Sequence, residues 1–304
     1  MLFSTVFQLH KELRQVKLQD FVPQDFYYSL NWRARGTQPG SHATRMPGGS
    51  LDFRGYVPFM ESPDPRRIDV RATLRSVPRM LMTKAFYERG AVDVVAVLDL
   101  SASMGFSGAS NKLQQMADIA ASIAWSAIRH GDNFSLVVCD DEIRRDLCMP
   151  ASHRPGLAQE VYGMIRQAKI MEGARTSALT LAVEHIRRKR ALVFLISDFH
   201  LDESCMTAAV RSLAMHDVVP LVLWDRAEYQ DLPEWGWARV RDMESAEIGS
   251  LFMRRGLAAK IRQSYEQRRR QIADICRLAG ARAPFFSGDD FDAERLSRHL
   301  LEVA

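Results

Sequence analysis

The sequence predicts an α/β protein with a doubly wound, mainly parallel sheet flanked by helices, preceded by an N-terminal extension. Two observations support this expectation. From about residue 91 onwards, short apolar runs rich in β-branched residues recur along the chain, and stretches with helical periodicity separate them. Such alternation is typical of sheets whose strands are buried on both faces.

The four expected strands are apolar runs of eight or nine residues, and the helices between them have apolar residues three and four apart. The strands span 92–100, 133–141, 191–199 and 218–225. The helices span 111–130, 156–169, 176–190, 203–216 and 256–279. Gly131 and Gly280 follow two of these helices and predict where they end.

The rest of the chain divides into two zones, which gives three parts in all. Residues 1–50 form an N-terminal extension and linker, in which the glycine- and proline-rich run 33–50 is interpreted as a loop. Residues 51–90 are dense in arginine and proline and are expected to pack on the core. Residues 91–304 form the α/β domain with C-terminal helical elements.

Composition and charge exclude several classes of protein. Hydrophobic residues make up 47% of the 304 residues, and the net charge of +4 is far below that of an obligate nucleic-acid binder. No window has the roughly 18 uninterrupted apolar residues that a membrane-spanning helix needs. Residues 1–20 do not resemble a secretory signal. We therefore expect a cytoplasmic protein without a membrane span and without a nucleic-acid partner.

The cysteines are expected to be reduced thiols. Cys139, Cys148, Cys205 and Cys276 lie far apart in the sequence, with no C-x-x-C pair and no histidine at metal-site spacing. A buried, reduced thiol is the better interpretation for Cys139 and Cys276.

Oxygen-bearing side chains follow the first expected strand. Asp99, Ser101 and Ser103 alternate there, and in an extended segment their oxygens can point toward one spot. A turn of this kind alone could equally be a helix N-cap. However, Asp198 ends the third strand and Thr176 lies in a glycine-containing loop, so separate loops supply similar ligands. Oxygen-only ligands predict a hard cation such as Mg²⁺ or Mn²⁺.

These residues resemble the metal-ion-dependent adhesion site (MIDAS) of the von Willebrand factor A (VWA) domain. The D-x-S-x-S motif, loop threonine and later aspartate of that family match Asp99, Ser101, Ser103, Thr176 and Asp198. The resemblance implies that the serines and threonine mainly touch the metal directly and that one coordination position stays open for an acidic residue of a partner. Met104, which also agrees with the family pattern, Arg175 and His200 are the expected partner contacts.

The arginine-rich segment resembles the region before the VWA domain in an uncharacterised bacterial family. The matching residues are Arg54, Tyr56, Asp64, Arg66, Ile68, Asp69 and Arg75, with Asp242 and Glu244 further downstream. Val70 departs from the tryptophan that is usual in that family. The resemblance spans about residues 48–300 and implies an adaptor that works with a MoxR-type AAA+ ATPase. Such pairs mature or activate client complexes, including metal-dependent dehydrogenases such as methanol dehydrogenase.

Two interpretations of the arginines stay open. They form an ion-pair network that docks the extension onto the sheet, which we favour, or they form a phosphate-binding patch. Three further arginines in the run 267–271 are expected to lie on a solvated helix face.

The chain is expected not to be an enzyme. It has no G-x-x-x-x-G-K-[ST] loop and no G-x-G-x-x-G after a strand. His200 and His153 are the candidate bases, and each is interpreted more simply as a loop histidine. The alternative is a metal-assisted hydrolase that uses the same cation.

Overall fold

The computed structural model describes residues 21–34, 39–106, 108–171, 177–233, 235–241 and 248–302. The strands are β1 (Pro39–Pro58), β2 (Met82–Gly90), β3 (Asp93–Asp99), β4 (Asn133–Cys139), β5 (Met149–Ser152), β6 (Leu192–Ser197), β7 (Asp217–Leu223), β8 (Gly236–Arg241), β9 (Ile248–Met253) and β10 (Phe285–Ser287). The α-helices are α2 (Val70–Arg75), α3 (Lys112–Arg129), α4 (Leu157–Arg166), α5 (Glu203–Ser212), α6 (Arg226–Tyr229), α7 (Arg255–Leu278) and α8 (Ala293–Glu302). Short 3-10 helices are η1 (Pro65–Arg67), η2 (Ala102–Gly105) and η3 (Ser177–His185).

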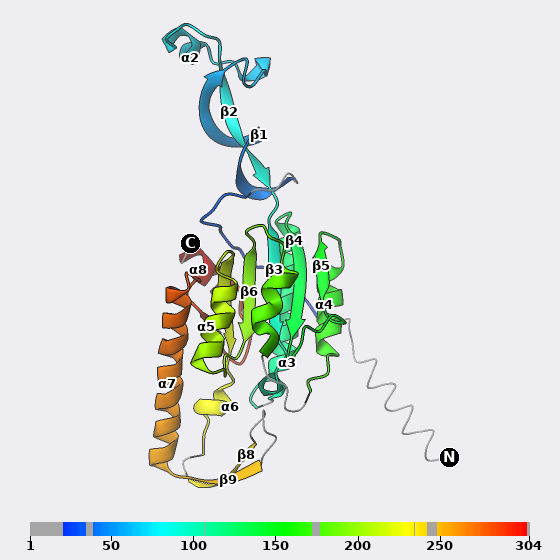
Figure 1. Cartoon of the computed structure of the whole chain (residues 1–304), viewed down its shortest axis with the longest axis vertical. Coiled ribbons are helices and arrows are strands. Elements are labelled where there is room, and N and C mark those ends of the chain that lie inside the picture. The colour runs from blue at the N-terminus through cyan, green and yellow to red at the C-terminus, as the bar shows by residue number, and fades with distance from the viewer. Residues whose placement is uncertain are drawn as a thin grey trace, which may run out of the picture.

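The central sheet confirms the expected fold class. Its strand order is β10-β7-β6-β3-β4-β5, and every pair is parallel except β4 with β5. From β3 the chain builds β4 on one side and later returns to place β6 and β7 on the other side (Figure 1). The direction of winding therefore reverses between β3 and β6. In open α/β sheets, ligands bind beyond the carboxyl ends of the strands at such a point.

The predicted strands correspond to β3, β4, β6 and β7, with ends within two residues of those expected. The expected helix at 176–190 is shorter, because the structure has the 3-10 helix η3 only to His185. Residues 187–190 are all basic and exposed, so they offer no apolar face to continue a helix against the sheet. None of the described helices is both long enough and apolar enough to cross a bilayer.

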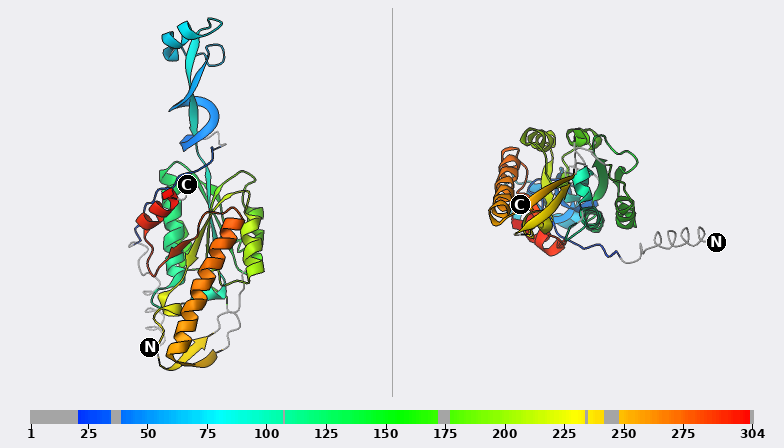
Figure 2. Two further views of the ribbon diagram at one scale, coloured as in Figure 1. Left: turned by 90° about the vertical axis from the view of Figure 1, so that its left-hand side faces the viewer. Right: turned by 90° about the horizontal axis from the view of Figure 1, so that it is seen from below.

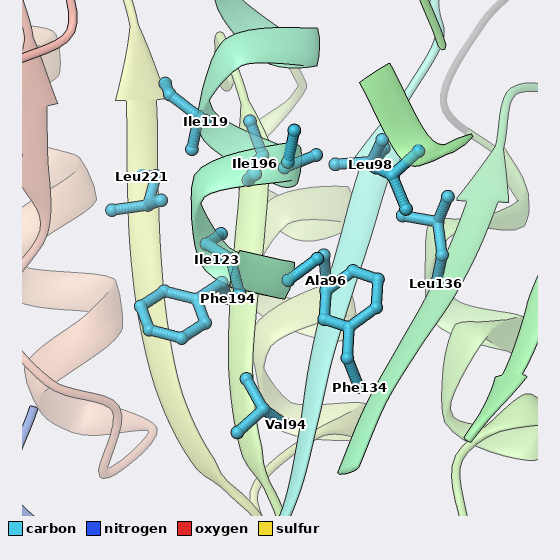
Figure 3. Close-up of a cluster of buried hydrophobic side chains, with 14 of the residues drawn as sticks. Val94, Ala96, Leu98, Ile119, Ile123, Phe134, Leu136, Phe194, Ile196 and Leu221 are labelled. Carbon is cyan, nitrogen blue, oxygen red and sulfur yellow. The ribbon is translucent and has the colours of Figure 1, made fainter. Parts of the chain in front are cut away.

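Strand alternation divides the core into two layers. Val94, Ala96 and Leu98 of β3 point toward α3, where Ile119 and Ile123 meet them (Figure 3). The intervening valines of β3 point to the opposite layer, which η3, α5 and α7 cover. Both faces of β3 are buried, which explains why its sequence is a continuous apolar run. Cys139 and Cys276 belong to the second layer, and none of the four cysteines forms a disulfide.

Helix α3 begins and ends as local sequence signals predict. The Asn111 side chain accepts a hydrogen bond from the backbone N–H of Gln114 at 2.9 Å, which caps the first turn. The helix ends at Arg129, and Gly131 then adopts φ +79°, a left-handed conformation that glycine takes without steric cost. This cap places Lys112 in the first turn, at the carboxyl end of the sheet.

Residues 39–90 form an arm that projects from the sheet (Figures 1 and 2). The loop interpretation of 33–50 is wrong from Pro39 onwards, because β1 pairs antiparallel with β2 through several register shifts. The arm also differs from the expected packing on the core, since no side chain from Phe53 to Leu81 is buried. Asp64 and Asp69 make caps and ion pairs within the arm, and Asp64 lies 3.1 Å from the Arg67 guanidinium. Asp69 caps α2 and lies 3.3 Å from the Lys84 ammonium.

The core makes a stability prediction. Leu98→Ala, at a fully buried position, should lower the free energy of unfolding by about 2–5 kcal/mol, because it removes buried surface and leaves a cavity. Leu278→Ala, at a position that is 70% exposed, is the matched control and should change it by no more than about 0.5 kcal/mol. Urea unfolding followed by circular dichroism measures both values. Equal losses in the two variants would contradict this assignment of the core.

Candidate metal centre

Asp99 lies at the carboxyl end of β3 and is completely buried. Its Oδ1 accepts a hydrogen bond from the backbone N–H of Ser101 at 2.9 Å, and its Oδ2 accepts one from the Ser197 hydroxyl at 2.6 Å. Ser197 is the last residue of β6. The second bond therefore joins the two strands between which the winding of the sheet reverses, and it fixes the orientation of the carboxylate.

The two serines of the D-x-S-x-S motif lie together beside Asp99. Their hydroxyl oxygens are 3.1 Å apart, with Ser101 buried and Ser103 partly exposed. The 3-10 helix η2 starts directly after Ser101 and turns the chain back over the strand end. Met104, an expected partner contact, is fully buried in the layer beneath α3. It therefore supports the loop from inside and offers no surface to a partner.

Asp198 follows β6 and is 1% exposed. A tight turn holds it, in which Phe199 has the left-handed φ of +53° that is costly for a bulky residue. The indole N–H of Trp224 donates to the Asp198 carbonyl at 2.8 Å, and Arg268 donates to the Phe199 carbonyl at 2.8 Å. The turn is thus fixed by groups from two other elements. Arg268 belongs to the arginine run that we expected to be solvated.

Lys112 is a buried residue of this centre that the sequence analysis did not identify, and it contacts Asp198. The Lys112 ammonium lies 3.0 Å from an Asp198 carboxylate oxygen and 2.5 Å from a Glu228 carboxylate oxygen, and its side chain is 2% exposed. Glu228 comes from α6, which follows β7. The only available signal was position: Lys112 opens the first helix after the serine loop. Nothing in the local sequence indicates that its ammonium turns inward.

The electrostatics of this centre are unbalanced. Burial and the neighbouring Asp198 charge raise the pKa of Asp99 to about 6, although hydrogen bonds from Ser197 and Ser101 oppose the rise. Burial would also raise the pKa of Asp198, but the charges of Lys112 and His200 outweigh it and hold that pKa below its usual value. Lys112 is paired with Asp198 and Glu228, whereas the Asp99 carboxylate is held by hydrogen bonds alone. A cation beside Asp99 would therefore offset a buried negative charge.

His200 lies next to the centre but is held by other side chains. Its Nε2 is 3.3 Å from Glu228 Oε2, which also accepts a hydrogen bond from the Tyr265 hydroxyl at 3.1 Å. Its ring stacks on Trp224 at 6.2 Å between centroids. His200 and Tyr265 line a cavity of about 710 Å³ between the loop after β6 and helix α7.

The remaining predicted residues either lie outside the described part of the chain or stand elsewhere in the fold. Thr176 and Arg175, together with Asp242 and Glu244, lie outside the described residues. His153 contacts the carbonyl of Asp132 at 2.7 Å, just before β4 begins, which is the opposite edge of the sheet.

The residues present fit a hard divalent cation. Asp99, Ser101, Ser103 and Asp198 supply only oxygen donors, and the buried carboxylates carry more negative charge than Lys112 offsets. Within the described ranges, nowhere do three or more His, Cys, Asp or Glu side chains gather in a metal-binding arrangement.

Comparison with known proteins gives one family match and several distant structural matches. A family model described as "Protein of unknown function DUF58" matches residues 53–274. No curated protein matches significantly.

Three of the solved structures that it resembles are 12–13% identical to it and have TM-scores below 0.5. The conserved hypothetical protein BatB from Bacteroides thetaiotaomicron has 13% identity and a TM-score of 0.43, covering 70% of this chain and 98% of that one. An aerotolerance-related membrane protein from Bacteroides fragilis has 12% identity and a TM-score of 0.40 with the same coverage. The pilus adhesin SpaC from Lactobacillus rhamnosus GG has 12% identity and a TM-score of 0.38, covering 70% of this chain and 29% of that one.

The raised pKa of Asp99 predicts a pH dependence of stability without metal. Between about 3.8, its value when exposed, and about 6, the folded protein holds this proton more than the unfolded chain does. The free energy of unfolding should therefore fall as pH rises from about 4 to 6, by on the order of 3 kcal/mol from this group. Urea unfolding in EDTA across this range should show the fall in the wild type and a smaller fall in Asp99→Asn. Parallel pH profiles for the two proteins would contradict the burial of this charge.

The buried lysine makes a separate prediction. Lys112→Met should lower the free energy of unfolding by about 3–5 kcal/mol, because it leaves the Asp198 and Glu228 carboxylates buried without their counter-ion. Lys260→Met, at an exposed position on α7, is the matched control and should have little effect. Thermal and urea unfolding at neutral pH measure both. A Lys112→Met protein as stable as the control would show that the ion pairs are not formed.

Proposed function

The chain belongs to the DUF58 family of proteins of unknown function, and from this premise we propose that it is a cytoplasmic, metal-dependent protein-binding adaptor. Mg²⁺ or Mn²⁺ would be held by Asp99, Ser101, Ser103 and Asp198, with Thr176 as a further ligand. When bound, the ion would supply an open coordination position for an acidic side chain of the partner. The role is binding, without catalysis by the chain itself.

One observation carries the proposal: the convergence of the D-x-S-x-S loop and Asp198 at the point where the sheet reverses its winding. Residues almost 100 positions apart are joined there by the bond from Ser197 to Asp99. The same residue types in the same order characterise the adhesion site of VWA domains, which supports a shared use of the site.

The surrounding side chains favour capture of a carboxylate over hydrolysis. Lys112 and the backbone N–H of His200 each contact one oxygen of Asp198 and orient this carboxylate, and its lowered pKa makes it a weak general base. His200 contacts Glu228 and stacks on Trp224. These contacts fix the His200 side chain beside the site, and a preorganised site suits recognition of an incoming side chain.

The proposed partner is a MoxR-type AAA+ ATPase, and the proposed outcome is maturation or activation of a client complex, such as a metal-dependent dehydrogenase of the methanol dehydrogenase kind. Support comes from the arginine-rich segment before the domain, which resembles that of VWA proteins associated with these ATPases. The chain has no nucleotide phosphate-binding loop of its own, so the energy for remodelling would come from the partner.

The test is isothermal titration with Mg²⁺ and Mn²⁺, followed by a pull-down from a native host. Wild type should bind one ion per chain, and Asp99→Ala should weaken binding by about 100-fold or more, because a ligand is lost and not merely a supporting group. Asp274→Ala, at an exposed position on α7, is the matched control and should bind as wild type does. An AAA+ ATPase should be captured with Mg²⁺, lost in EDTA and recovered when Mg²⁺ is restored.

Two results would overturn the proposal. Capture that is unchanged in EDTA and in Asp99→Ala would show that the metal is not the contact. Metal-dependent hydrolysis by the purified chain that disappears in Asp99→Ala would favour the hydrolase alternative.

A further inference from the structure

A second cavity lies at the opposite edge of the sheet from the candidate metal centre. Its volume is about 830 Å³, and residues of both the arm and the body line it. Its principal lining residues are Trp32, Arg33, Arg54, Tyr87, Arg188 and Arg190. Arg54 and Tyr87 belong to the arm, whereas Arg188 and Arg190 directly precede β6. Three separate segments thus build one concave site, which we call the arginine pocket.

The arginine pocket carries concentrated, unneutralised positive charge. Its lining includes four arginines and neither aspartate nor glutamate. In the part of the chain that the structure describes, none of the four guanidinium groups makes an ion pair with a carboxylate. Four like charges around one concavity repel one another. An anion placed among them would remove that repulsion.

The pocket is organised before any ligand arrives. The Arg33 guanidinium lies 3.9 Å from the centre of the Tyr87 ring, and that of Arg190 lies 5.2 Å from the Trp32 ring, so aromatic faces restrain both. The Trp32 indole N–H donates to Asp217 at 2.9 Å, which fixes the ring.

The buried aspartate beneath the pocket, Asp217, does not neutralise the pocket's arginines. Asp217 is buried and is paired with Arg282 through two hydrogen bonds of 2.6 and 2.8 Å. Its negative charge is therefore already neutralised by a residue outside the pocket. Arg282 also donates to the Ser29 carbonyl at 2.8 Å, which holds the segment that carries Trp32 and Arg33 against the body.

We propose that the arginine pocket binds a small ligand that carries two or more phosphoryl groups. Guanidinium forks match phosphate oxygens in pairs, and several forks can share the charge of neighbouring phosphates. The volume is within the range of about 300–1,000 Å³ that is typical of small-molecule sites. A concave site fits a compact ligand better than a nucleic-acid duplex, which needs an extended basic stripe.

The experiment is isothermal titration with inorganic pyrophosphate and with ATP, in EDTA, so that the result does not depend on the metal centre. Wild type should bind pyrophosphate at one site per chain, more weakly as salt rises. Arg54→Ala and the double variant Arg188→Ala/Arg190→Ala should each weaken binding about tenfold or more, the size expected for losing charge-assisted hydrogen bonds. These arginines are exposed, and circular dichroism confirms that the variants fold.

Matched controls separate the pocket from general charge. Arg270→Ala removes one exposed arginine of α7 that lies outside the pocket and should leave pyrophosphate binding unchanged. Citrate is the carboxylate control and should bind at least about tenfold more weakly than pyrophosphate. Vesicles containing cardiolipin, a lipid whose headgroup carries two phosphates, distinguish the source of the phosphoryl groups. Variant-sensitive vesicle binding that pyrophosphate displaces identifies a lipid headgroup, and pyrophosphate binding without vesicle binding identifies a free phosphorylated ligand.

Several outcomes would overturn the assignment. These are binding that survives the Arg188→Ala/Arg190→Ala change, equal affinity for citrate, no binding of pyrophosphate or vesicles, or binding of duplex DNA alone. Loss of metal binding in the titration of the other site would leave this result untouched, because the two sites lie at opposite edges of the sheet.

Discussion

The hydrogen bond from the Ser197 hydroxyl to Asp99 is the contact on which the carboxyl end of this sheet depends. It joins β6 to β3 where the winding reverses, and it holds a carboxylate that burial makes costly to ionise. Asp198 follows at once and brings a second buried negative charge close to the first. The structure can accommodate both only because Lys112 supplies a buried counter-ion and backbone N–H groups supply hydrogen bonds.

This arrangement explains why so many elements converge on one loop. Trp224 holds the backbone of Asp198, and Arg268 holds that of Phe199 in a conformation that a bulky residue avoids. Such strain persists only where surrounding contacts determine the geometry. The turn after β6 is therefore rigid, which suits a site that must present oxygen ligands without rearrangement. Lys112 balances part of the charge, and the remainder is what makes a divalent cation a fitting occupant.

The parallel sheet also separates two kinds of surface. Its carboxyl edge gathers the carboxylates of Asp99 and Asp198, whereas its amino edge gathers the four arginines of the arginine pocket beside the arm. A chain with a net charge of only +4 thus has opposite local charges at its two ends. The overall charge gave no indication of this polarity, because it sums contributions that the fold places far apart.

The sequence by itself determined the strands β3, β4, β6 and β7 and the helices α3, α4, α5 and α7, because burial on both faces leaves a continuous apolar run and helix caps are local signals. It also placed Asp99, Ser101, Ser103 and Asp198 at strand ends. Only the tertiary structure decided that Lys112 turns inward, that Met104 is core, that residues 39–58 pair as a strand, and that Arg54 and Arg190 share a cavity. Each of these depends on partners distant in sequence, and no local pattern encodes which distant segment a side chain will meet.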